Sequence, residues 1–229
     1  EGTHLLEAFL NAGGRPECVY VAENRLEDAE ISALLQRMPS EKTVSVAAPI
    51  LGRLTGLGEG GNIVALIKLP SAAKRPEDGD CVVLERVQDP GNIGTILRSA
   101  AASGVRDIVL SADCADVWSP KVLRAAMGAH FLLTLHPDTD LAVWRQGYRP
   151  PLLATALDER ACGLYGLDLR EPCGWLFGNE GAGVSAEMRR VADRTVKIPM
   201  AGDTESLNVA MAATVCLFEQ MRQRLPAAE

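Results

Sequence analysis

Five residues with side chains suited to binding or catalysis lie in three short segments of the second half of the chain. The segment 88–98 contains Asn92 and Arg98, the segment 176–185 contains Glu180, and the segment 198–208 contains Ser206 and Asn208. The set has one Arg, one carboxylate, two Asn and one Ser. It has neither a Lys or His suited to act as a base nor a Ser–His pair, so it favours positioning and electrostatic stabilisation over covalent catalysis.

The third segment has a simpler interpretation, which is helix capping. Thr204, Ser206 and Asn208 all have good N-cap side chains, and they precede a stretch, 209–218, in which Thr214 is the only polar residue. A cap stabilises a helix by about 1 kcal/mol and needs only one such residue. We therefore expect one to cap while Ser206 and Asn208 serve a site. A helix this apolar on nearly every face is predicted to be buried.

The other two segments also have structural interpretations. Taken alone, segment 88–98 is better explained by Asn92 as a helix cap and Arg98 as a surface side chain whose stem covers apolar groups. Segment 176–185 contains three glycines within six residues, which allow close backbone approach to a ligand and expose amide donors. A carboxylate such as Glu180 would repel phosphate, so the predicted ligand is neutral or cationic there.

Strands and helices alternate around these segments. Strands are predicted at 81–87, 107–110, 131–135, 152–157, 174–178 and 194–200, and helices at 92–103, 119–129, 140–146 and 185–192. This alternation predicts an α/β fold with a parallel sheet covered on both faces. Ligands of such sheets bind beyond the carboxyl ends of the strands, where all three segments fall.

The first part of the chain reads as a separate small α/β unit. Helices are predicted at 4–14 and 27–38, strands at 18–23 and 62–69, and a linker in the Pro- and charge-rich stretch 69–80. The sequence GLGEGG (56–61) fits the glycine pattern of dinucleotide-binding loops. However, a strand follows it where that motif requires a helix, so a turn is the better interpretation and a nicotinamide-dependent oxidoreductase is rejected.

Composition narrows the function further. The net charge is −7, and neither part is basic: residues 1–80 have 8 basic and 12 acidic side chains, the rest 15 and 18. Any nucleic-acid surface is therefore local, or is completed by a second subunit. The six cysteines lack C-x-x-C spacing and predict reduced core thiols of a cytoplasmic protein. No metal-ligand cluster and no membrane span is expected. Because residue 1 is Glu, we expect the natural chain to begin further upstream.

Three stretches resemble sequence motifs of the SpoU branch of the SPOUT superfamily, the TrmH-like RNA methyltransferases. They are QDPGNIGTILRSAAASGV (88–105), LFGNEGAGVS (176–185) and VKIPMAGDTESLNVAMAATVCLFE (196–219). The resemblance implies a SPOUT domain at 81–229 with a C-terminal trefoil knot. Residues 1–72 resemble the L30e-like substrate-binding domain that precedes it in many members, with a linker at 73–80.

The resemblance also implies an activity, the transfer of a methyl group from S-adenosylmethionine to a ribose 2′-hydroxyl of RNA by a homodimer. Ribosomal RNA is favoured as substrate. Transfer RNA is the alternative, and so is a non-catalytic RNA-binding ribosome-assembly factor. Arg98 is expected to stay protonated and to stabilise the developing alkoxide. The implied catalytic residues are Asn92, Arg98, Glu180, Ser206 and Asn208, and the implied cofactor-binding residues are Gly178, Ile198, Met200, Leu207 and Asn208.

Overall fold

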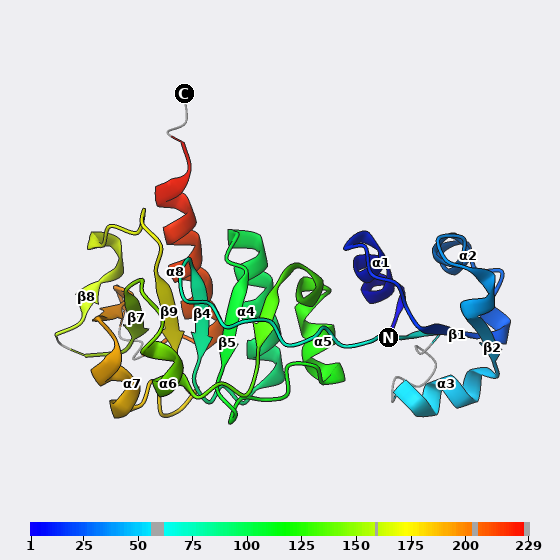
Figure 1. Cartoon of the computed structure of the whole chain (residues 1–229), viewed down its shortest axis with the longest axis horizontal. Helices are drawn as coiled ribbons and strands as arrows, with labels where there is room; N and C mark the ends of the chain where they lie inside the picture. Colours follow the sequence, from blue (N-terminus) through cyan, green and yellow to red (C-terminus); the bar gives the residue numbers. More distant parts are fainter. Residues whose placement is uncertain (56–61, 159, 203–205, 227–229) are drawn as a thin grey trace. The chain divides into compact units, whose positions relative to one another are not determined.

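Strand and helix segments of the sequence build two units, Glu1–Ser71 and Ala72–Glu229, in the computed structural model (Figure 1). The structure describes residues 1–55, 62–158, 160–202 and 206–226. The GLGEGG stretch and Thr204 lie outside the described residues, so the interpretations placed on them stay predictions.

The first unit is a three-stranded sheet with helices. Strand β1 is central, parallel to β2 and antiparallel to β3. Alternate residues of β1, Val19 and Val21, are buried with Leu6 and Ile31 of the helices, which is the pattern of a half-buried strand. The predicted helices and strands are confirmed, whereas β2 and α3 were missed. The elements are α1 (Thr3–Asn11), β1 (Cys18–Ala22), η1 (Glu23–Arg25), α2 (Ala29–Leu35), η2 (Ser40–Lys42), β2 (Thr43–Val46), α3 (Ala48–Thr55) and β3 (Ile63–Leu66).

The second unit has a seven-stranded sheet of order β6-β5-β4-β9-β7-β10-β8, in which every pair of neighbours is parallel. The predicted α/β fold with a parallel sheet is therefore confirmed. The strands are β4 (Cys81–Leu84), β5 (Asp107–Leu110), β6 (Thr134–His136), β7 (Leu152–Thr155), β8 (Cys162–Gly163), β9 (Gly174–Phe177) and β10 (Arg194–Lys197). The helices are α4 (Pro90–Ser103), α5 (Pro120–Ala126), η4 (Ala129–Leu132), α6 (Leu141–Arg145), η5 (Leu164–Gly166), α7 (Ala186–Val191) and α8 (Val209–Arg224).

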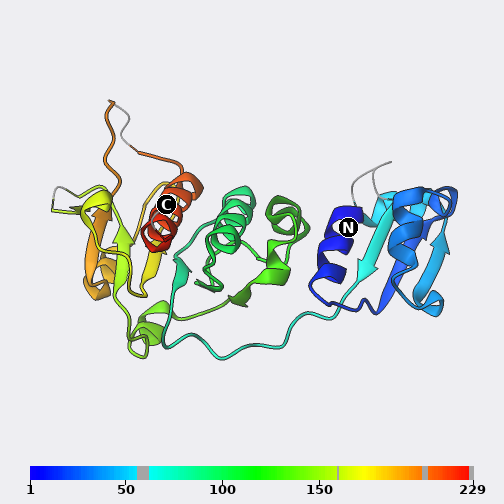
Figure 2. The same ribbon diagram turned by 90° about the horizontal axis from the view of Figure 1, so that it is seen from above.

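Alternate residues of the central strands point to two separate cores. On β4, Val82 and Leu84 pack with side chains of α4, α5 and α8, whereas Cys81 and Val83 pack with side chains of α6 and α7. Figure 2 shows α4 and α8 side by side on one face of the sheet, with α6 on the other. The sheet is thus covered on both faces, as the apolar strands predicted.

The C-terminal strands enter the sheet between strands that precede them in the sequence. Strand β9 lies between β4 and β7, and β10 lies between β7 and β8. The chain then crosses back, so that α8 packs on α4, with the hydroxyl groups of Ser99 and Thr214 hydrogen-bonded at 2.7 Å. This order brings the ends of β4, β9 and β10 together although they are far apart in sequence.

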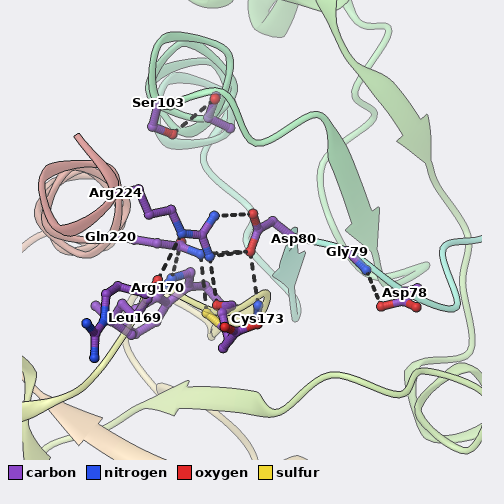
Figure 3. A network of polar contacts seen from close by, with 12 residues as sticks. Asp78, Gly79, Asp80, Ser103, Leu169, Arg170, Cys173, Gln220 and Arg224 are labelled. Carbon is purple, nitrogen blue, oxygen red and sulfur yellow. Dashed lines mark hydrogen bonds and ion pairs between the residues drawn. The ribbon is translucent and has the colours of Figure 1, made fainter. Parts of the chain in front are cut away.

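The last turns of α8 are fastened to the start of β4 by a polar network (Figure 3). Arg224 forms an ion pair with Asp80 and also donates to the carbonyl oxygens of Leu169 and Glu171. Gln220 donates to the same Asp80 carboxylate at 2.8 Å and accepts from the indole of Trp175. The predicted linker 73–80 lies within the second unit, and its last residue, Asp80, is bonded to α8.

Two details of the second unit differ from the sequence-based expectation. Residues 131 and 132, predicted to begin a strand, belong to the short helix η4 (Ala129–Leu132), because Met127 and Gly128 adopt left-handed conformations that end α5 and redirect the chain. Helix α8, predicted to be buried, is only partly so. Met211 is 49% exposed and Phe218 is 38% exposed, because the sheet and α4 cover only one side of the helix.

Candidate active site

The cap of helix α4 is Asp89, and the interpretation of Asn92 as a cap was wrong. The Asp89 carboxylate accepts a hydrogen bond from the Asn92 backbone amide at 2.8 Å, and Pro90 occupies the first helical position, where a missing N–H costs nothing. The Asn92 side chain is therefore free for other contacts. The local sequence predicted Asn92 as the cap and did not single out Asp89.

Asn92 joins the other two segments. Its side-chain amide donates to Oε1 of Glu180 at 3.1 Å, and its Oδ1 accepts from the side-chain amide of Asn208 at 2.9 Å. Asn92 comes from the first turn of α4, Glu180 from the loop after β9, and Asn208 from the N-cap of α8. Three of the five predicted catalytic residues thus form one hydrogen-bonded series.

Asn208 has two structural functions at once. Its Oδ1 caps α8 by accepting from the backbone amides of Ala210 and Met211, while its Nδ2 donates to Asn92. The expectation that capping and site functions belong to different residues was therefore wrong for Asn208. An Asn can do both because its amide group carries an acceptor and a donor.

Glu180 fixes the loop that follows β4. Its carboxylate accepts from the backbone amides of Asp89 at 3.0 Å and Gln88 at 3.3 Å, besides the Asn92 side chain. Partial burial by itself would raise the pKa of Glu180, but these hydrogen bonds to the charged form outweigh it and the net pKa is lowered. Glu180 is therefore an ionised carboxylate whose oxygens already accept hydrogen bonds from the protein.

The glycine-rich loop folds onto itself. A Cβ on Gly178 would lie 2.2 Å from both the carbonyl carbon of Gly183 and the amide nitrogen of Val184, so only glycine fits. The side chain of Asn179 accepts from the amides of Gly181 and Ala182, and its backbone oxygen accepts from Gly183. These three amides are bonded within the loop, which contradicts the expectation that they serve as exposed donors.

A pocket of about 440 Å³ opens at the carboxyl ends of β7, β9 and β10. Four of the five residues predicted to bind a cofactor line it, whereas Asn208 does not. Glu180 and Ser206 line it too, and apolar side chains such as Val196, Val209 and Leu157 supply much of the rest. The pocket lies where parallel sheets bind ligands. The four predicted residues that line it are Gly178, Ile198, Met200 and Leu207.

Arg98 is separate from this group. It lies on α4 and is exposed, it does not line the pocket, and no ion pair within the described stretches engages it. The described residues therefore bring together four of the five predicted catalytic residues. Glu180 and Ser206 line the pocket, and Glu180 also belongs to the hydrogen-bonded series with Asn92 and Asn208. Arg98 is available to a group that approaches from outside.

Two cationic side chains at the pocket were missed by sequence reasoning. Arg189 of α7 and Lys197, the last residue of β10, both line it. Lys197 stands in the third motif at a strand end, which was a usable signal. Arg189 stands in an ordinary amphipathic helix and gave none.

Features of other classes of site are absent from the described ranges. No group of three His, Cys, Asp or Glu side chains there is arranged to hold a metal ion. The six cysteines are free, and Cys81, Cys173 and Cys216 are buried, which raises the pKa of each thiol to about 12. No helix in these ranges is long and apolar enough to cross a membrane.

Comparison with known proteins places the chain in a family. Residues 80–218 match the model of the SpoU rRNA Methylase family. An uncharacterized tRNA/rRNA methyltransferase of Synechocystis is 36% identical, covering 98% of this chain and 83% of the relative. The 23S rRNA (uridine(2479)-2′-O)-methyltransferase of Streptomyces viridochromogenes is 33% identical, covering 93% of this chain and 78% of the relative.

A solved structure agrees with these matches. The crystal structure of the SpoU methyltransferase AviRb from Streptomyces viridochromogenes, in complex with the cofactor AdoMet, superimposes with a TM-score of 0.84 at 30% identity. The match covers 97% of this chain and 88% of the other. The chain belongs to the SpoU rRNA methylase family, as its three motifs predicted.

Proposed function

We propose that this protein is an S-adenosylmethionine-dependent RNA methyltransferase that methylates a ribose 2′-hydroxyl of ribosomal RNA. The observation that carries the proposal is the pocket beside the Glu180–Asn92–Asn208 series. The pocket's volume falls within the range of small-molecule sites, about 300–1,000 Å³. Ile198, Met200 and Leu207 offer apolar contact for a purine ring, and Gly178 keeps the loop close, so the residues fit the cofactor.

The bound cofactor would supply a methyl group on a sulfonium centre, and the protein's residues orient the acceptor. In our proposal Arg98 holds an RNA phosphate and stabilises negative charge developing on the 2′-oxygen. A guanidinium, with a pKa above about 12, is always protonated and cannot itself remove the proton. Its exposure and its lack of an ion pair among the described residues support this function.

Ser206 and Asn208 would orient the ribose. Asn92, held by Glu180, would fix the position of the segment that contains Ser206 and Asn208. Glu180 is already bonded to the loop after β4, so we assign it a positioning function. Alignment of reacting groups accelerates such a displacement because it removes much of the entropy cost. Rigid hydrogen bonds between the three segments serve that purpose.

The finer fold assignment also belongs to this proposal. The insertion of β9 and β10 between earlier strands, followed by the return of α8 to α4, supports a C-terminal trefoil knot. We propose that residues 1–72 are an L30e-like RNA-binding domain, 73–80 a linker and 81–229 the methyltransferase domain. The small sheet with helices in residues Glu1–Ser71 supports the first assignment.

A homodimer is the proposed assembly. Met211 and Phe218, two turns apart on α8, are exposed apolar side chains on a helix whose other side is buried. Such a partly covered apolar helix is a surface that a second copy could cover. Cytoplasmic location, and ribosomal over transfer RNA, stay predictions; the name of the Synechocystis relative includes both kinds of RNA.

Two measurements test this function. Isothermal titration with S-adenosylmethionine should saturate near one cofactor per chain, with no heat from NADH. Labelled methyl groups should then appear on ribose 2′-oxygens of ribosomal RNA. If only transfer RNA were methylated, transfer RNA would replace ribosomal RNA as the proposed substrate. A folded protein that binds no S-adenosylmethionine would make the non-catalytic RNA-binding factor the better proposal.

A further inference from the structure

The two cations at the pocket are not used by the function proposed above. Arg189 and Lys197 both contribute to the wall that Gly178, Ile198 and Met200 also form. Neither has an ion pair or a side-chain hydrogen bond within the described part of the chain. By contrast, other arginines of this unit, such as Arg145 and Arg224, are bonded to carboxylates.

Within the described lining of the pocket, carboxylate groups do not balance these two charges. Of the described residues that line the pocket, Glu180 is the only acidic one. Its oxygens accept from two backbone amides and from Asn92, as described above. The described lining therefore has an excess of one positive charge, and an anionic group of a ligand would gain from meeting it.

We propose that Arg189 and Lys197 bind the α-carboxylate of the methionine moiety of S-adenosylmethionine. The inference rests on the proposed function, because it takes that cofactor as the pocket's ligand. The apolar side chains Ile198 and Leu207 would contact the purine end, so the cationic wall is left for the amino-acid end. Arg189 can make two parallel hydrogen bonds to a carboxylate, whereas Lys197 acts as a point charge.

An RNA phosphate is the competing anion. The position of the two residues favours the cofactor, because both line the same pocket as the residues assigned to it. Arg98, which lies outside the pocket and is exposed, is better placed for the phosphate backbone. Experiments can distinguish the cofactor carboxylate from an RNA phosphate, because binding of the cofactor can be measured without RNA.

The test uses the full-length variants Arg189→Gln and Lys197→Gln, with Arg190→Gln as control. Arg190 is exposed on the same helix next to Arg189, but it does not line the pocket. Isothermal titration measures the Kd of S-adenosylmethionine and of its decarboxylated analogue, which keeps the ammonium and sulfonium groups. Circular dichroism melting confirms that each variant is folded.

We expect each pocket variant to bind S-adenosylmethionine about tenfold more weakly, the size expected for one charge-assisted hydrogen bond. Arg190→Gln should bind it like the wild type, and the decarboxylated analogue should not distinguish the pocket variants from the wild type. Equal weakening for both ligands would overturn the proposal, as would unchanged cofactor binding with weakened RNA binding. Failure of the wild type to bind S-adenosylmethionine would instead overturn the proposed function.

Discussion

The side-chain amide of Asn208 donates a 2.9 Å hydrogen bond to Oδ1 of Asn92, joining the cap of the last helix to the first turn of α4 across 116 positions of sequence. Asn92 in turn donates to Glu180. The relative positions of the three motifs therefore depend on Asn92, which lines no part of the pocket.

Replacing Asn92 separates catalysis from cofactor binding. We expect Asn92→Ala to lower kcat by about 100-fold, because loss of alignment by as little as 1 Å can cost that much. The Kd of S-adenosylmethionine should stay unchanged. Gln88→Ala is the matched control, because Gln88 contacts Glu180 only through its backbone amide. Equal kcat in the two variants would contradict the positioning function.

Glu180 makes stability depend on pH. Its pKa is lowered in the folded protein, so the unfolded state binds a proton first as the pH falls. The stabilisation by Glu180 is fully present above the ordinary Glu pKa of 4.5 and is lost as the pH falls through the lower, folded-state pKa. Urea unfolding of the wild type and of Glu180→Gln should therefore differ most near neutral pH and converge in acid. If the difference in unfolding free energy between the two proteins stayed constant from neutral pH into acid, this account would be contradicted.

Two glycines of one loop should respond differently to alanine. Gly178→Ala places a methyl group 2.2 Å from the backbone of Gly183 and Val184, so we expect a loss of about 1–3 kcal/mol in unfolding free energy, with weaker cofactor binding. Gly181→Ala meets nothing nearer than 3.7 Å, to Oδ1 of Asn179, and should be tolerated. Thermal melting and cofactor titration of both variants check the contrast, and similar behaviour would argue against a close-packed loop.

The ion pair of Arg224 with Asp80 should matter more than a surface pair. Arg224→Ala removes bonds to Asp80 and to two carbonyl oxygens, at an expected cost of about 2 kcal/mol. Arg170 pairs with Asp168 on the surface, where both side chains are mostly exposed and solvent screens the pair, so Arg170→Ala should cost much less than Arg224→Ala. Denaturant unfolding measures both. Equal costs would mean that the network in Figure 3 does not hold α8 in place.

The proposed dimer depends on the exposed side of α8. Phe218→Glu and Met211→Glu should convert the dimer to a monomer in sedimentation experiments, because each places a charge in an apolar contact. Val143→Glu is the control, since Val143 is 62% exposed on α6. A wild type that sediments as a monomer, or variants that remain dimeric, would exclude this face as the interface.

Much of the fold could be predicted because strands and helices alternate clearly. The alternation predicted that the strands are parallel, and a parallel sheet predicted a pocket at the carboxyl ends of its strands. Finer choices depended on tertiary contacts. Asp89 rather than Asn92 caps α4, and the Asn92 side chain bonds to Glu180 instead. Asn208 both caps α8 and donates a hydrogen bond to Asn92.

Other site features could not be predicted because they arise only when distant elements meet. Arg189 reaches the pocket from α7, beside residues of β10 and of the loop before α8. The exposure of Phe218 depends on how much of α8 the rest of the fold covers, which apolar content alone does not reveal. The glycine-rich loop was expected to present its amides to a ligand, but Asn179 occupies them.

The place of β9 at the centre of the sheet has a consequence for synthesis on the ribosome. Strands β4, β5 and β6 emerge first and β7 follows, yet β4 and β7 have no shared edge until β9 pairs with both. The nascent chain must therefore hold the three-stranded fragment β6-β5-β4, with an open edge on β4, and an unpaired β7 until residues 174–177 have left the exit tunnel. Such long-range pairing is slow, and open edges invite aggregation. Folding yield should therefore fall in a cell with little chaperone capacity, even when the finished protein is stable.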